Sequence, residues 1–179
     1  MSMIKKHLLV VLCWTFLFCS CGKGYKDADI LESWQAQNDK FKIKVTSFNE
    51  WNPVGLVNGA YYVSKSAPLQ SDKWVEIMTF RHDDPDPINR EGVNFVNEDT
   101  AFVYMVRQFA VTTDAGNNWT VWDASKDKNL SVRLNYEIIK NVKIRTDGSG
   151  EMLLQSISSG EPSRTLFTID YGRTWTSQR

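Results

Sequence analysis

Residues 112–119 read TTDAGNNW, and residues 168–175, near the end of the chain, read TIDYGRTW. Both stretches follow the pattern Thr-x-Asp-x-Gly-x-Asn/Thr-Trp, and both come directly after apolar residues that are typical of strand ends. An Asp side chain can accept hydrogen bonds from the main-chain N–H groups that follow it, and Gly allows the positive φ of a tight turn. The Trp then begins a returning strand with a large apolar surface. Each stretch is therefore predicted to form the tip of a β-hairpin.

The two stretches resemble the Asp-box of BNR-repeat proteins, a short motif found in sialidases and many other β-propellers. Two full matches in one short chain indicate a repeat. In the families it resembles, the motif is structural and lies away from the catalytic face, so it predicts a fold and not a ligand. The alternative is that the two Asp residues are catalytic or bind a metal. The residues assigned to structural turns are Thr112, Asp114, Gly116, Trp119, Thr168, Asp170, Gly172 and Trp175.

The sequence around the first box predicts a four-stranded meander. Residues 93–104 fit two strands joined by a polar turn, residues 108–112 fit a third strand, and residues 119–122 begin a fourth. Residues 141–154 repeat this layout before the second box.

An earlier part of the chain predicts further strands, because apolar and polar residues alternate over residues 40–46 and apolar runs follow at residues 56–64 and 74–80. Residues 62–74 align with the first box as a degenerate copy in which Ser66 replaces the Asp.

The predicted fold class is all-β, a partial propeller-like stack of two to three antiparallel four-stranded meanders with Asp-box hairpins. The β domain is expected to span residues 40–179. Closed propellers use at least about four blades. Three architectures are therefore possible: an unclosed stack of sheets, a β-sandwich built of the same hairpins, or part of a propeller that another chain completes.

Residues 1–20 are predicted to be a lipoprotein signal peptide. Lys5 and Lys6 precede an apolar run at residues 8–19, which is shorter than the roughly 20 residues that span a bilayer. The sequence LFCSCG that follows resembles a bacterial lipobox, with Phe18 in place of the commoner Leu, and implies lipid attachment at Cys21. An uncut anchor is the alternative.

Residues 21–39 are predicted to be the lipidated tether and a short amphipathic helix over residues 27–39, with Ile30, Leu31 and Trp34 on one side. Gly22 after the cysteine implies the outer membrane, with the protein facing the periplasm of a bacterial cell envelope.

Charge and cysteine content narrow the function classes. The chain holds 21 Lys and Arg residues and 21 Asp and Glu residues, so it has no electrostatic footprint for nucleic acid. Cleavage before Cys21 would remove the other two of its 3 cysteines and leave no disulfide. The domain must then be stabilised by its apolar core.

Residues 82–86 read HDDPD and form the one cluster that resembles a metal or acid–base site. The spacing matches no regular calcium loop, and the prolines indicate a solvated loop. A Ser-His-Asp relay through His82 has no support in the spacing, and the motifs of a sialidase active site are not recognisable. We therefore assign no catalytic residue, metal or cofactor. Asp83, Asp84 and Asp86 are the candidates for binding a partner, because this polar loop is free of the box turns and of the predicted core.

The predicted function is that of a non-catalytic, lipid-anchored envelope protein that binds a protein partner, as an assembly factor, an envelope subunit or a toxin-immunity protein. The alternative is a carbohydrate-binding module or a relative of sialidase-like glycosidases. Surface exposure of Trp51, Trp122 or Tyr136 would favour carbohydrate binding.

Overall fold

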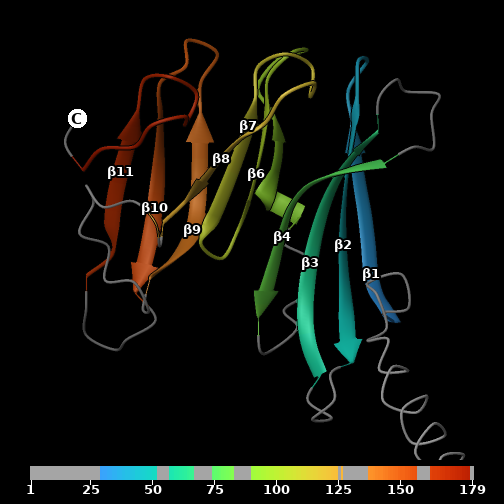
Figure 1. Cartoon of the computed structure of the whole chain (residues 1–179). Helices are drawn as coiled ribbons and strands as arrows, with labels where there is room; N and C mark the ends of the chain where they lie inside the picture. Colours follow the sequence, from blue (N-terminus) through green and yellow to red (C-terminus); the bar gives the residue numbers. More distant parts are fainter. Residues whose placement is uncertain are drawn as a thin grey trace, which may run out of the picture.

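A computed structural model describes residues 29–51, 57–66, 74–82, 90–124, 126, 137–156 and 162–177. In these residues the chain forms three antiparallel sheets with neighbouring strands consecutive in sequence (Figure 1). The first sheet holds β1 (Asp29–Gln37), β2 (Lys42–Trp51), β3 (Val57–Ser66) and β4 (Trp74–His82). The middle sheet holds β5 (Val93–Phe95), β6 (Ala101–Met105), β7 (Gln108–Thr112) and β8 (Thr120–Asp123), after the short 3₁₀ turn η2 (Arg90–Gly92). The third sheet holds β9 (Glu137–Ile144), β10 (Gly150–Ser156) and β11 (Arg164–Thr168).

The prediction of an all-β stack of antiparallel meanders is confirmed. The third sheet has three strands, and its fourth is reduced to one bridge between Phe167 and Thr176, whose main-chain N–H and C=O groups exchange hydrogen bonds of 2.8 and 2.9 Å. Both boxes therefore occupy the same place, between the third and fourth strands of their meander. The β3–β4 connection, where the degenerate copy was predicted, occupies this place in the first sheet.

The prediction of a helix over residues 27–39 is wrong, because β1 occupies this segment. Trp34 and Ala36 are half-buried, and the odd-numbered residues between and beside them are exposed. Ile30 and Trp34 are four positions apart, which fits one helix face and equally one strand face. Pairing with β2 satisfies the main-chain groups on the side of this edge strand that faces β2. The β domain therefore includes Asp29–Gln37, which lies before residue 40.

The middle sheet lies between the other two, and its strands β6 and β7 are buried on both faces. Successive residues of β6 point to opposite faces. Ala101 and Val103 join the first core, which lies between the first and middle sheets, while Phe102 and Tyr104 join the second core, between the middle and third sheets. All five residues of β6 are consequently buried.

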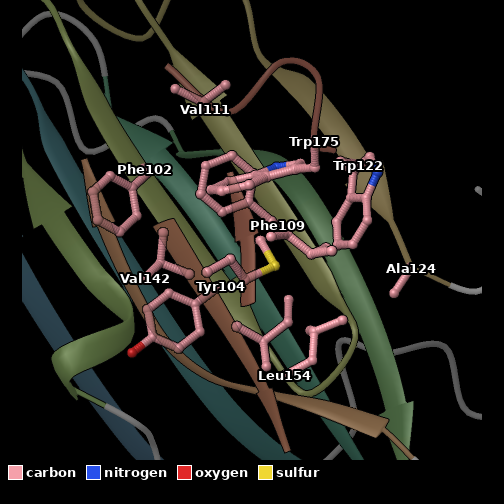
Figure 2. Packing of buried hydrophobic residues seen from close by; sticks show 12 residues of the cluster. Phe102, Tyr104, Phe109, Val111, Trp122, Ala124, Val142, Leu154 and Trp175 are labelled. Carbon is pink, nitrogen blue, oxygen red and sulfur yellow. The ribbon is translucent and has the colours of Figure 1, made fainter. Parts of the chain in front are cut away.

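Each core combines side chains from two neighbouring sheets. The first core contains Phe41, Ile43, Val45, Met78, Val93, Ala101, Val103, Met105 and Ala110. The second core contains Phe102, Tyr104, Phe109, Val111, Trp122, Ala124, Ile139, Val142, Met152, Leu154, Leu166 and Trp175 (Figure 2).

The sheets stack in one direction, since each later sheet uses its box Trp to pack on the sheet before it. Trp119 of the middle sheet packs against the first core, and Trp175 of the third sheet is buried in the second core. The ring of Trp175 meets the ring of Phe109 edge to face, with centroids 5.4 Å apart (Figure 2). Trp34 of β1 also packs against the first core.

A bidentate ion pair joins the first and last strands of the third sheet. Arg164 donates from Nε to Glu137 Oε1 at 2.7 Å and from a terminal nitrogen to Glu137 Oε2 at 2.6 Å. Glu137 is buried, so this guanidinium compensates a charge that would be costly alone.

Within the part of the chain that the structure describes, no helix is long and apolar enough to cross a membrane.

Candidate binding surface

In both boxes the Thr hydroxyl connects the Asp to the Gly. Thr112 donates to Asp114 Oδ1 at 2.8 Å and accepts from the Gly116 N–H at 2.9 Å. In the second box, Thr168 donates to Asp170 Oδ1 at 2.7 Å, and the Gly172 N–H donates to the same hydroxyl at 2.9 Å. The matching distances show that the two stretches form the same local structure.

The two box carboxylates are engaged by their own turns. Asp114 accepts from the Asn118 N–H at 2.9 Å and from the Asn118 side-chain amide at 2.7 Å. Asp170 accepts from the Thr174 N–H at 3.0 Å and from the Thr174 hydroxyl at 2.7 Å. Each carboxylate therefore uses both oxygens within the turn, and this geometry fits the structural role assigned to the box.

Hydrogen bonding sets the protonation state of these two groups. Burial raises the pKa of Asp114, but the bonds donated by Asn118 and Thr112 together outweigh it and hold the pKa below the ordinary value of 3.8. Burial likewise raises the pKa of Asp170, and the bonds from Thr174 and Thr168 lower it below that value. Both side chains are thus held as carboxylates.

A double variant, Asp114→Asn with Asp170→Asn, tests whether the lowered pKa values of these two side chains make the stability of the fold depend on pH. Because the folded pKa of each Asp is lowered, its stabilisation is fully present above the unfolded pKa and is lost as the pH falls through the folded pKa. We expect the melting temperature of the natural protein to drop more steeply below about pH 4 than that of the double variant. Thermal unfolding followed by circular dichroism from about pH 7 to about pH 2.5 measures both slopes. Equal slopes would show that the two carboxylates do not stabilise the fold.

Each box is also tied to the first hairpin of its own sheet. The Ala115 N–H donates to the Asp99 carbonyl at 2.9 Å, and the Tyr171 N–H donates to the Gly148 carbonyl at 2.9 Å. Ala115 and Tyr171 have φ values of 54° and 62°, the left-handed conformation that precedes each box Gly. All these turns lie at the upper end of Figure 1.

The first hairpins carry a repeat that the sequence analysis missed. In each, an Asn or Asp side-chain oxygen accepts a main-chain N–H from two residues later, at 2.9 Å. The acceptors are Asn38, Asn97 and Asp147. A signal was available, because an Asn or Asp in a polar turn before an apolar strand is typical of this side-chain-closed turn.

Several residues singled out in the sequence lie outside the described residues. These include Cys21, the loop residues Asp83, Asp84 and Asp86, and Tyr136. Their roles stay predictions. Trp122 is only 8% exposed and packs in the second core, so it offers no flat surface to a sugar. Among the described residues, no group of three or more His, Cys, Asp or Glu side chains is placed to hold a metal ion.

Among the described residues, no further sheet packs on the outer face of the third sheet, which is one of the two ends of the stack. The pairing of Ala101 with Thr112 in the middle sheet corresponds to the pairing of Gly150 with Thr168 in the third. Counting along the strands from these pairs relates the two sheets position by position. The middle sheet uses Phe102, Tyr104, Phe109 and Val111 to receive the third sheet, and the third sheet has Glu151, Leu153, Thr165 and Phe167 at the same positions.

This open face is hollowed and partly apolar. One hollow of about 310 Å³ lies between Arg145, Phe167 and Ile169, and a second of about 190 Å³ lies between Lys143, Leu153 and Thr165. Glu151 lines both. Ile169 is 87% exposed and Leu153 is 36% exposed on this face. The two hollows therefore form one continuous candidate surface.

The two boxes differ in how the residue after the Thr is covered. In the first box this residue is Thr113, which is half-buried and accepts a hydrogen bond from Arg173 of the third sheet. In the second box it is Ile169, which no described residue of the chain covers to any comparable extent. The position that receives the next sheet in one repeat is thus exposed in the other.

Comparison with known protein families, with curated proteins and with solved structures finds no match for this chain. The class that the described residues define is an all-β stack of three antiparallel sheets, whose third sheet has a partly apolar outer face.

Proposed function

We propose that the chain is a non-catalytic, lipid-anchored protein of the bacterial envelope that binds a protein partner through the outer face of its third sheet. Cys21 supplies the anchor, and the stacked sheets hold the binding face rigid. In this role the chain acts as an assembly factor, an envelope subunit or an immunity protein that blocks a toxin.

One observation carries the proposal, namely that the third sheet exposes the face with which the middle sheet receives its neighbour. Exposed apolar surface of this kind is typical of protein interfaces. Leu153 and Ile169 are exposed aliphatic side chains on this face, and Phe167, which lines the larger hollow, is half-buried. The burial of Trp122 weakens the carbohydrate alternative.

A role without catalysis is supported by the state of the box carboxylates. Asp114 and Asp170 are committed to their own turns through several hydrogen bonds each. A general acid or base needs a carboxyl group within reach of the substrate proton and with a pKa near the working pH. The lowered pKa values of these two groups do not suit that task.

Site-specific photo-cross-linking in the cells that make the protein tests this function. A photoreactive phenylalanine analogue is placed at Leu153 or Thr165 on the open face, and at the exposed residues Glu98 or Lys126 beside the middle sheet as matched controls. We expect one discrete cross-linked protein from the first pair of positions and background from the second. Equal labelling at both pairs of positions, or no discrete product from either, would contradict the proposed binding face.

A further inference from the structure

Resting on the proposed function, we propose that the partner at the open face is a second copy of the chain, which docks the outer face of its first sheet on the third sheet. These two faces are the two ends of the stack (Figure 1). Two copies that exchange this contact join twice three sheets into one ring of six. Closed propellers use about four to eight sheets, so a ring of six lies within their range.

Trp74 has the place of a box Trp in the first sheet. It is the first residue of the fourth strand, β4, while Trp119 directly precedes the fourth strand β8 and Trp175 directly precedes the bridge residue Thr176. Trp119 and Trp175 each pack on the sheet before their own. By the same stacking rule, Trp74 belongs in contact with a sheet that precedes the first one.

The Trp74 side chain lies on the outer face of the first sheet. Lys44 alternates along β2 with Ile43 and Val45, which are buried in the first core, so Lys44 points to the outer face. Its Nζ lies 4.5 Å from the centre of the Trp74 ring, which places the ring on that face as well. Trp74 is half-buried, and no further sheet among the described residues packs on it. A large aromatic ring is thus available at the point where each later sheet packs on its neighbour.

The third sheet has a hollow where the middle sheet has an aromatic ring. Inside the chain, the Trp175 ring packs edge to face on Phe109. The position that corresponds to Phe109 in the third sheet holds the smaller residue Thr165, which lines the hollow of about 190 Å³. Trp74 of a second copy, arriving as Trp175 arrives, would place its ring over Thr165 and fill this hollow. Filling it buries apolar area and adds dispersion contacts.

Charged side chains on the two faces match when Trp74 enters the hollow. Lys44 lies on the Trp74 ring and therefore arrives beside it, while Glu151 lines the hollow. On the first sheet, Lys44 and the exposed Glu76 lie in one row, because both pair with the same residue of β3. On the third sheet, Lys143 and Glu151 pair across neighbouring strands. Each face thus offers one positive and one negative group, and docking sets Lys44 against Glu151.

The symmetry of this ring suits a lipid-anchored protein. Two copies that exchange one head-to-tail contact are related by a two-fold axis, which runs along the axis of the ring. Both copies then present the same ends of their strands to the same side. The chain that precedes β1 leaves both copies toward one side, so two anchors of the kind proposed at Cys21 can enter one membrane.

The test uses a photoreactive phenylalanine analogue at Thr165 of the full chain in its membrane. We expect a product with the mass of two copies, and mass spectrometry of the cross-linked peptide should place its other end on β2 or β4. Trp74→Ala should lower this product by about tenfold or more, since a buried Trp anchor dominates contacts of this kind. Native mass spectrometry of the full chain in detergent, without the cross-linker, should give two copies.

A charge exchange between the two faces tests the docked arrangement itself. Glu151→Lys alone and Lys44→Glu alone are each expected to lower the two-copy product by about tenfold, because like charges then meet. Combined in one chain, the two changes restore an opposite pair and should recover most of the product. Lys126→Glu is the matched control and should change nothing, because Lys126 lies exposed beside β8 of the middle sheet.

A discrete product with a different protein would overturn the second copy as the partner while leaving the proposed binding function in place. Two copies joined third sheet to third sheet, or products of more than two copies, would overturn the ring. Full yield from Trp74→Ala, or no recovery in the double charge exchange, would overturn the docked arrangement. Absence of any product from Thr165 would remove the docking face and the proposed function together.

Discussion

Replacing Gly172 by Ala is expected to lower the free energy of unfolding by about 2–4 kcal/mol, through backbone strain and overpacking. Gly172 has a φ of +85°, which disfavours every residue with a Cβ atom. A Cβ atom here would lie 2.6 Å from Phe109 Cζ and 2.9 Å from Trp175 Cζ2. Both rings belong to the second core and have little room to move.

Gly148→Ala is the matched control for this prediction. Its φ of +86° is nearly the same, but an added Cβ would lie 3.0 Å from the outer edge of the Tyr171 ring. We expect this variant to lose about 1–2 kcal/mol from the backbone alone. Urea unfolding of both variants gives the difference. Equal losses would mean that the Cβ at residue 172 meets no rigid core.

Replacing Trp175 by Ala is expected to cost about 3–5 kcal/mol, the range for large aromatic side chains in cores. The side chain is 4% exposed, and its ring contacts Phe109 and Trp122 of the middle sheet. Removing it opens a cavity where the third sheet meets the middle one. Trp119→Ala, at the same position of the first box, should cost less because Trp119 is half-buried. A larger loss for Trp119 in the same urea series would contradict the assigned burial.

The hairpin tips could be predicted from the sequence because their chemistry is local. Thr112, Asp114 and Gly116 bond to each other across at most four residues. The strands around them follow from alternation and from β-branched and aromatic content. The four-stranded order of the middle sheet therefore agrees with its prediction, and the third sheet repeats it with a shortened last strand.

The helix predicted over residues 27–39 failed because the apolar spacing there satisfies two periods at once. The segment becomes a strand because it pairs with β2, which is a tertiary contact that the sequence of the segment alone does not reveal. The Glu137–Arg164 ion pair could not be predicted from the sequence for a similar reason, since 27 positions separate the two residues. Such contacts depend on strand register, which a motif does not specify.

The candidate binding face could not be predicted because it depends on which way the sheets stack. Lys143, Leu153 and Phe167 alternate with buried neighbours on their strands, and the sequence pattern alone does not say which set faces a partner sheet. The predicted contacts Asp83, Asp84 and Asp86 came from elimination in the sequence and stay a prediction. The open face came from comparing two repeats in space.

The central claim is that the middle and third sheets each pack their box Trp on the sheet before them and leave their other face for the next layer. Double-mutant cycles on unfolding free energy test this most directly, with Trp175→Ala combined with Phe109→Ala and, separately, with Leu153→Ala. We predict a coupling of about 0.5–1.5 kcal/mol between Trp175 and Phe109, which are in ring contact. Trp175 and Leu153, on opposite faces of the third sheet, should be additive within about 0.5 kcal/mol. Additivity with Phe109 together with coupling to Leu153 would contradict the stacking direction.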